Sequence, residues 1–274
     1  MRMLICTIGS KRRRSTLRFA QEVAKALSAR VMLLGVVDKQ RKAEDLEQFL
    51  AQAADALRAD GLETRVRVEM GNAEDIVVDE METGTYDLVA LGALGRKRSH
   101  HRFLSSVAMR IIERSESSVL VIKRSRPSLS RVLICASGME QGHLSVWAGA
   151  AVACGAKARA TVLHVVDALP SMYTGLEQME ETLAELLGSD TEKSRELKWA
   201  AQVVKAECEI SELKLRRGIA ADEILREGRV GDYDLIVLGS SRSAGGIVRV
   251  LMGDLARTIV TRAERPVLVV RPSN

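Results

Sequence analysis

The sequence predicts an α/β protein made of two similar doubly wound domains, each with a mostly parallel five-stranded sheet flanked by helices. Short runs rich in Val, Ile and Leu alternate along the chain with longer helical patterns. Such strand–helix alternation favours right-handed crossovers and a parallel sheet. The same series of motifs also occurs twice, in the same order, and the 274 residues are enough for two ordinary domains.

The predicted strands of the first half are five short apolar runs, at 3–8, 31–37, 64–69, 87–92 and 119–123. These runs are nearly continuous rather than alternating, which indicates a sheet covered on both faces. Between them, residues 15–29 and 43–59 carry apolar residues at three- and four-residue spacing. That spacing predicts two amphipathic helices.

Four segments of the first half recur in the second half. The pairs are 3–9 with 132–138, 35–38 with 164–167, 84–92 with 231–239, and 119–123 with 267–271. The polar stretch 125–130 between the halves has the composition of a linker, so we expect domains at 1–125 and 131–274. The second half has a longer insertion, 168–205, in which Gly188, Ser189 and Asp190 predict a break between two helices.

Composition excludes several classes of protein. Hydrophobic residues make up 46% of the chain and charged residues 28%, which is incompatible with a disordered or fibrous protein. No apolar run approaches the ~18 residues of a membrane span, and the start of the chain lacks a signal-type segment, so a cytoplasmic protein is expected. The net charge of +5 is modest for this length and does not indicate nucleic-acid binding. Aromatic residues make up only 3% of the chain, too few to build the stacking platform that single-stranded nucleic acids require.

Cysteine and histidine spacing indicates neither disulfides nor a metal site. The four Cys show no close pairing and the four His never fall at i, i+4 spacing. Cys6 and Cys135 occupy equivalent places in predicted strands, so core packing is expected of them. His164, beside the second strand of its half, is expected to be structural.

A ligand of such a domain is expected at the carboxyl ends of the strands, in the loops after the first and fourth strands. After the fourth strand come Gly92 and Gly95, followed by nine residues and then by Ser105 and Ser106, which open a helical pattern. Glycines let a backbone approach a phosphate, and a helix N-terminus favours an anion. Ordinary turn chemistry also explains many Gly-x-x-Gly pairs.

These residues resemble the universal stress protein family, whose nucleotide-binding members carry Gly-x2-Gly-x9-Gly-Ser/Thr after the fourth strand. The resemblance covers nearly the whole chain twice. It implies ATP or a related adenine nucleotide as ligand, with or without Mg²⁺, and pairing of 119–122 with 267–270 to form an intramolecular pseudo-dimer. The site residues that it implies in the first domain are Val36, Gly92, Gly95, Ser105 and Ser106.

The chain departs from the family pattern in both halves. In the first, Ile8 replaces the Asp that closes the first strand, and Ser105 replaces the third glycine. The second half keeps Val165, Gly239 and, as the third glycine, Gly253. There, Ser137 replaces the first-strand Asp, Arg242 replaces the second glycine, and Asp254 replaces the hydroxyl residue. We therefore expect nucleotide binding mainly in the first domain.

Basic residues are concentrated near the proposed mouth of the first domain. They lie at 11–14 and within 96–102, whereas the loop 138–143 of the second half has no Lys or Arg. Cationic loops at one sheet edge attract anionic ligands. Two other interpretations stay open: these loops are solvated surface, or an arginine occupies the phosphate position itself.

Two functions follow as hypotheses. The first is a regulatory protein of the stress response that binds an adenine nucleotide. The alternative is a nucleotide-free module that acts through a protein partner or through homo-oligomers beyond the pseudo-dimer. An enzyme is not expected, at most slow ATP hydrolysis, because nothing in the sequence positions a water or the side chains of His100 and His101 for catalysis.

Overall fold

The computed structural model describes residues 1–8, 13–37, 43–92, 106–126, 128–136, 140–166, 183–208, 210–240 and 253–272. Its first half contains β1 (Arg2–Ile8), α1 (Arg13–Ala26), β2 (Arg30–Val37), α2 (Ala43–Ala59), β3 (Thr64–Met70), α3 (Ala73–Thr83), β4 (Leu88–Gly92), α4 (Ser106–Arg114) and β5 (Ser118–Ile122). Its second half contains β6 (Arg131–Ala136), α5 (Glu140–Gly155), β7 (Arg159–Val166), α6 (Leu183–Gly188), α7 (Glu192–Glu207), β8 (Ile210–Arg217), α8 (Ala220–Val230), β9 (Leu235–Gly239), α9 (Asp254–Arg262) and β10 (Val267–Val270).

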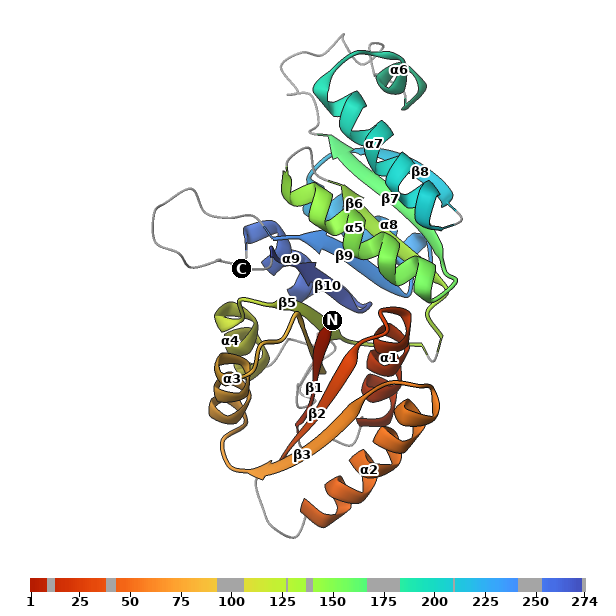
Figure 1. Ribbon diagram of the computed structural model, residues 1–274. Coiled ribbons are helices and arrows are strands. Elements are labelled where there is room, and N and C mark those ends of the chain that lie inside the picture. The colour runs from red at the N-terminus through yellow and green to blue at the C-terminus, as the bar shows by residue number, and fades with distance from the viewer. Residues whose placement is uncertain are drawn as a thin grey trace.

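The strands of both halves form one ten-stranded sheet in the order β3-β2-β1-β4-β5-β10-β9-β6-β7-β8 (Figure 1). Neighbouring strands within each half are parallel. The halves join through β5 and β10, which are antiparallel, with Leu120 opposite Leu268. Two doubly wound domains and the pairing of their last strands, both predicted, are confirmed.

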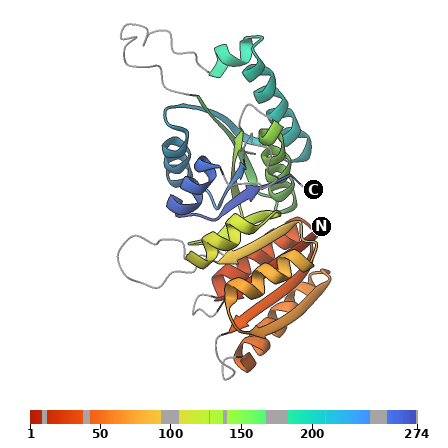
Figure 2. The same ribbon diagram turned by 90° about the vertical axis from the view of Figure 1, so that its left-hand side faces the viewer.

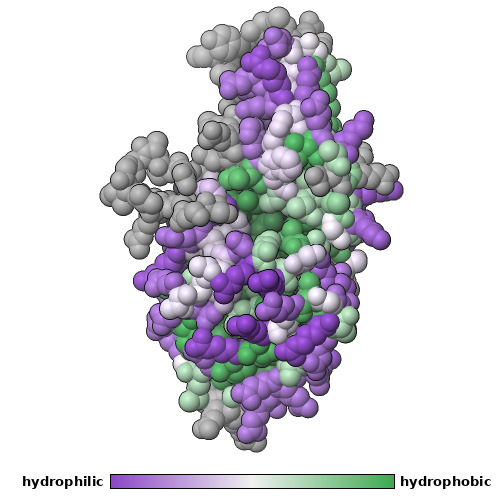
Figure 3. Space-filling view, in the orientation of Figure 1, coloured by the Kyte–Doolittle hydropathy of each residue, from purple (hydrophilic) through white to green (hydrophobic). Residues whose placement is uncertain are grey.

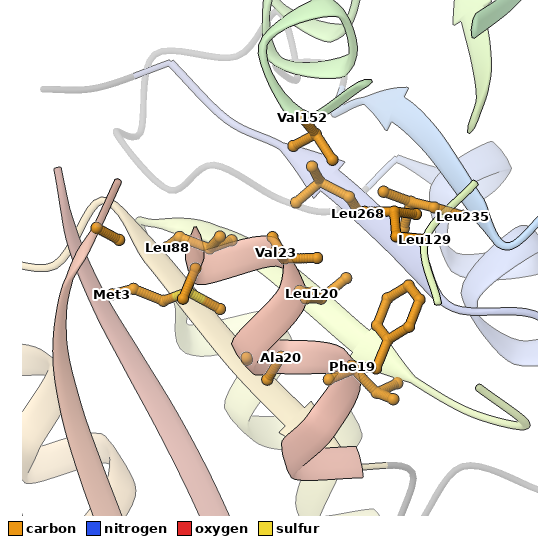
Figure 4. Close-up of a cluster of buried hydrophobic side chains, with 14 of the residues drawn as sticks. Met3, Phe19, Ala20, Val23, Leu88, Leu120, Leu129, Val152, Leu235 and Leu268 are labelled. Carbon is orange, nitrogen blue, oxygen red and sulfur yellow. The ribbon is translucent and has the colours of Figure 1, made fainter. Parts of the chain in front are cut away.

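Helices cover both faces of this sheet, so the strands are buried on both sides as their continuous apolar runs predict. In the second half, α5 and α7 lie on one side of the strands and α8 and α9 on the other (Figure 2). Each face has its own apolar core, and each core runs through both halves. Figure 4 shows Phe19, Val23 and Leu120 of the first half beside Val152 and Leu268 of the second.

The two halves also meet where α1 crosses α5. Ala26 and Gly155 hold equivalent positions in the repeat, and a Cβ added to Gly155 would lie 1.8 Å from the carbonyl oxygen of Ala26. No side chain fits that space, so a glycine at 155 is what allows the two helices to approach so closely.

A basic residue at the end of each half caps a helix of the other half. The Lys123 ammonium, just after β5, donates to the carbonyl oxygens of Val260, Thr261 and Ala263 at the C-terminus of α9. Arg271, just after β10, donates from Nη2 to the carbonyl oxygen of Ile112 in α4, at 2.9 Å. Cations at helix C-termini satisfy free carbonyls and complement the helix dipole.

Most predicted elements lie within two residues of their observed bounds, and the first helix shows the clearest difference. The sequence predicts it over 15–29, but α1 ends at Ala26. Ser28 adopts a left-handed φ of 47°, and the Ala29 N–H donates to the Ala24 carbonyl, so the chain leaves the helix there. The predicted break at 188–190 is confirmed by α6 and α7. No helix in the described ranges is long and apolar enough to cross a membrane.

Candidate functional site

The strand order of each half reverses at one place on its carboxyl edge. In the first half, β2 and β3 lie on one side of β1, while β4 and β5 lie on the other. Ile8 ends β1 and Gly92 ends the adjacent β4. The second half repeats this arrangement with Ala136 at the end of β6 and Gly239 at the end of β9. Ligands of open parallel sheets bind at such switch points.

Gly92 has a packing role that does not involve a ligand. A Cβ at this position would lie 3.1 Å from Cγ2 of Thr16 in α1, closer than side-chain carbons normally approach. The missing side chain therefore lets α1 pack against the end of β4. Substitution of Gly92 would disturb this packing as well as any anion contact.

Ser106 is the first residue of α4, as the sequence predicts. The helix runs for nine residues to Arg114, long enough for its N-terminus to carry the unpaired N–H groups and the favourable dipole that an anion requires. Gly95 and Ser105, the other predicted phosphate-loop residues, lie outside the described residues. The described part of this loop thus consists of its two ends, Gly92 and Ser106.

Ile8 and Val36 are neighbours in the sheet, since they pair in the β1–β2 ladder. The Val36 side chain is buried in the core on the α3 and α4 side. Ile8 packs against the same core, so the end of β1 offers an aliphatic group where the family pattern has a carboxylate. Only the backbone of Val36 is available for a polar contact.

The second half presents the corresponding residues differently. Gly239 pairs with Val270, Val165 is half-buried, and Gly253 is the N-cap of α9. The first turn of α9 contains Asp254, whose charge opposes the binding of an anion at this helix N-terminus.

Ser240, directly after β9, was not predicted as a site residue. Its side chain is buried and its Oγ has no hydrogen-bond partner within the structure described here. Buried hydroxyls are nearly always hydrogen-bonded. The signal in the sequence was a hydroxyl residue immediately after the Leu-Gly strand end that occurs in both halves, at the place that Ala93 holds in the first half.

The basic loops predicted near the first mouth fall largely on residues 9–12 and 93–105, which lie outside the described residues. Arg14, in the first turn of α1, is exposed. The anion-attracting, solvated and pocket-filling interpretations of these loops therefore stay predictions.

The buried thiols and His164 serve the fold, as predicted. Burial raises the pKa of the Cys6 thiol, with a smaller contribution from Glu80, and burial raises the pKa of Cys135 to about 12. Both stay neutral and unreactive near neutral pH. His164 is buried, with Nδ1 3.0 Å from the carbonyl oxygen of Ala136. No group of three or more metal-ligating side chains occurs in the described ranges.

Comparison with known proteins identifies the family. The model of the universal stress protein family matches residues 1–123 and again residues 129–271. The chain belongs to the universal stress protein family. It is a tandem member, because the family match occurs once in each half.

Individual universal stress proteins resemble this chain more distantly. A universal stress protein of Methanocaldococcus jannaschii is 31% identical over 112 residues, which are 40% of this chain and 62% of that protein, less than two thirds of its length. A universal stress protein of Archaeoglobus fulgidus has a crystal structure with a TM-score of 0.69 at 18% identity, covering 98% of each chain. A protein of unknown function from Pseudomonas aeruginosa PAO1 has a TM-score of 0.70 at 19% identity, covering 98% of this chain and 92% of its own. These structures share the fold over both halves.

Proposed function

We propose that this universal stress protein binds ATP or a related adenine nucleotide as a regulatory ligand, mainly in its first domain. The observation that carries the proposal is the start of α4 at Ser106, after a loop that leaves β4 at Gly92 beside the switch point. This arrangement supplies main-chain N–H groups and a helix dipole to phosphate oxygens. A protein of this kind needs no catalytic residue, and none is assigned.

The residues fit the phosphates better than the nucleoside. Main-chain groups of Gly92, Gly95, Ser105 and Ser106 would hold the phosphates, and the backbone of Val36 would face the adenine. Ile8 offers no carboxylate to the ribose. Mg²⁺ would arrive with the phosphates, because Mg²⁺ is commonly bound through substrate phosphates and retained waters rather than by a protein cage.

The second domain should bind more weakly. Asp254 in the first turn of α9 and Arg242 in place of a glycine both depart from the pattern of the first domain. We therefore expect that a nucleotide bound by Gly239, Gly253 and Val165 would be held more weakly than one in the first domain.

Isothermal titration of the full chain with ATP and Mg²⁺ tests this function. Gly95→Asp should abolish the binding heat, since its carboxylate repels phosphate, whereas Gly188→Asp should not, because no atom lies within 4 Å of a Cβ at 188. Ile8→Asp should tighten binding by restoring the acidic group. A flat titration of the wild-type protein at millimolar ATP would refute the proposal.

The alternative is a nucleotide-free interaction module within the stress response, working through a protein partner or a homo-oligomer. It is favoured by Ile8 at the end of β1 and by Asp254 at the start of α9. Absorbance at the purine maximum after denaturing freshly purified protein separates the two functions. Release of about one nucleotide per chain on denaturation supports the nucleotide-binding function. Absence of released nucleotide, together with a flat titration, supports the interaction module.

A further inference from the structure

Two buried polar groups of the second half have hydrogen-bonding capacity that no described residue uses. Arg271, just after β10, is 3% exposed, and its Nε and Nη1 have no partner among the described residues. Ser240, just after β9, is 1% exposed, and its Oγ is likewise without a partner there. Because buried polar atoms are nearly always hydrogen-bonded, these two residues indicate a bonding group that the described residues do not supply.

The two side chains lie next to each other on one face of the sheet. The Ser240 N–H donates to the Val270 carbonyl oxygen at 2.9 Å, which continues the parallel β9–β10 ladder, so Ser240 and Arg271 occupy neighbouring positions. Successive side chains of a strand alternate between faces. Leu238 and Val269, two residues before them, belong to the core under α4 and α9. Ser240 and Arg271 therefore point to that same side.

Two helix ends meet at this place. The guanidinium of Arg271 donates from Nη2 to the Ile112 carbonyl oxygen near the end of α4, at 2.9 Å. Arg257, near the start of α9, forms an ion pair with Glu113 of α4 at 3.4 Å, so α9 begins beside the end of α4. The N-cap of α9 is Gly253, which provides no side-chain hydrogen bond. The first main-chain N–H groups of α9 are therefore further donors at this place.

The first half lacks both features at the equivalent positions. Lys123, the counterpart of Arg271, uses its ammonium donors on three carbonyl oxygens at the end of α9. Ala93 stands in the sequence where the second half has Ser240. The fold itself therefore requires neither a guanidinium nor a hydroxyl here, which favours a ligand-binding role for both.

The chemistry of these groups indicates an oxyanion. The unused atoms of Arg271 are donors only, and a serine hydroxyl can donate as well. Charged side chains normally lie at the surface, as the hydrophilic residues over α2 do in Figure 3. Arg271 is buried instead, and no described carboxylate forms an ion pair with it. Since buried charges are normally paired, an anion with several oxygens would supply both the acceptors and the missing negative charge.

Two carboxylates oppose an anion here, but solvent weakens their effect. Asp254 is in the first turn of α9, and Glu116 acts electrostatically on Arg271. Both carboxylates are exposed, whereas Arg271 is buried. Charges in solvent are screened much more than buried ones, so the net field at the Arg271 guanidinium favours an anion.

We propose that Arg271 and Ser240 bind a small oxyanion, inorganic phosphate or a phosphoryl group, where the two halves join. Nε and Nη1 of Arg271 would donate to two of its oxygens, and Ser240 Oγ and the start of α9 to others. Because the unused atoms are enclosed, the chain has to open locally to admit the anion, and association should be slow. Neither residue belongs to the glycine pattern, and the site does not require that the first domain binds a nucleotide.

Titration of the full chain with inorganic phosphate, followed by nuclear magnetic resonance of the arginine Nε–H groups, tests the proposal. Arg271→Lys removes one of these resonances and thereby identifies that of Arg271. We expect millimolar phosphate to shift this resonance to a saturating value, because Nε becomes a charge-assisted donor. An Arg271 resonance that stays unchanged would overturn the proposal.

Isothermal titration with phosphate measures the contribution of each residue. Arg271→Lys should weaken binding roughly tenfold through loss of the bidentate pair, and Ser240→Ala roughly threefold through loss of one hydrogen bond. Asp254→Asn should tighten binding, because it removes an opposing charge. Arg262→Lys is the control, since it makes the same exchange at the other end of α9, where Arg262 pairs with Asp222, and it should bind like wild type.

Both weakening variants carry residues that the first half has at these positions, so they should fold, and thermal unfolding checks this. Equal affinity of wild type, Arg271→Lys and Ser240→Ala would place the phosphate elsewhere and refute the proposal. The Arg271 resonance also identifies the source of the oxyanion. A shift with ATP as well as with phosphate assigns the site to the phosphoryl group of a nucleotide, and a shift with phosphate alone assigns it to the free anion.

Discussion

Lys123 and Arg271 occupy equivalent positions but satisfy their hydrogen-bond donors differently. The ammonium of Lys123 donates to three carbonyl oxygens of the other half, and burial lowers its pKa to about 8, so it remains mainly protonated at pH 7. Arg271 reaches one carbonyl oxygen, while its Nε and Nη1 are buried without a partner among the described residues. Burial also lowers the pKa of Arg271. The five N–H donors of a guanidinium lie in one rigid plane and point in different directions. An ammonium is compact, so its three N–H donors can all bond to carbonyl oxygens grouped at one helix end.

Replacing Arg271 by lysine should therefore stabilise the protein. The carbonyls of Ile112, Glu113 and Ser115, at the C-terminal end of α4, correspond in the repeat to those that Lys123 contacts at the end of α9. We expect Arg271→Lys to raise the free energy of unfolding by about 1 kcal/mol, because it removes two unsatisfied buried donors. Urea denaturation measures this change.

The reciprocal variant, Lys123→Arg, is the control and should lower the free energy of unfolding. A loss of stability in Arg271→Lys would contradict this prediction. It would mean that Nε and Nη1 of Arg271 have partners outside the described residues, or that the carbonyl oxygens at the end of α4 cannot surround an ammonium.

At the scale of elements, one buried carboxylate attaches helix α8 to the edge strand β8. Glu227 of α8 accepts hydrogen bonds from Lys214 at 2.8 Å, from Arg216 at 2.7 Å and from the Tyr233 hydroxyl at 3.3 Å. Burial raises the pKa of Glu227, but the hydrogen bonds from the two cations outweigh burial and hold the pKa below its ordinary value. Glu80 of α3 takes the same place in the first half, bound to Arg67 and Tyr86.

Glu227→Gln should lower the free energy of unfolding by about 3 kcal/mol near neutral pH, because two cations lose a buried partner. A depressed carboxyl pKa stabilises the fold above the unfolded-state pKa, and this stabilisation is lost as pH falls through the folded-state pKa. The difference between wild type and Glu227→Gln should therefore shrink on acidification below about pH 4.3, the ordinary value for Glu.

Urea denaturation at several pH values between 7 and 3 measures this prediction. Glu264→Gln, which removes an exposed partner of Arg124, should cost less than about 1 kcal/mol at any of them. A difference for Glu227→Gln that stays constant with pH would show that the Glu227 carboxylate does not provide the stabilisation.

At the scale of the whole molecule, the antiparallel pairing of β5 with β10 makes the two halves one sheet. The outer edges are β3 and β8, which carry alternating charged residues such as Arg65, Arg67, Lys214 and Arg216. Charges on edge strands oppose further pairing. The apolar β5, in contrast, depends on its partner strand.

A fragment of residues 1–125 should therefore dimerise through β5, since removal of β10 leaves an apolar strand edge unpaired. Light scattering at tens of micromolar should give about twice the fragment mass, and addition of residues 131–274 should convert the dimer into a one-to-one complex. A monomeric fragment would show that β5 does not need a partner. The same experiment tests the domain boundaries at 125 and 131, which remain predictions.

Local patterns were sufficient for much of the fold. The continuous apolar runs predicted the strands, and Ser105-Ser106 predicted the start of α4. The end of α1 was missed, because the left-handed Ser28 has no glycine signal. The pairing of Trp147 with Trp199 was missed too, since the two residues lie in helices separated by a strand and a long insertion. For the candidate site, the strand ends could be predicted, but the packing of Gly92 against Thr16 could not.

The sequence alone determined the duplication, the family and the order of strands and helices, because each depends on periodicity or on motifs a few residues long. The tertiary structure decided which distant groups meet: Lys123 with the end of α9, Gly155 with Ala26, and the aromatic rings on α5 and α7. Such contacts depend on how two layers of helices pack on a shared sheet. The close packing of helices and strands selects them, and residue spacing along the chain does not encode them.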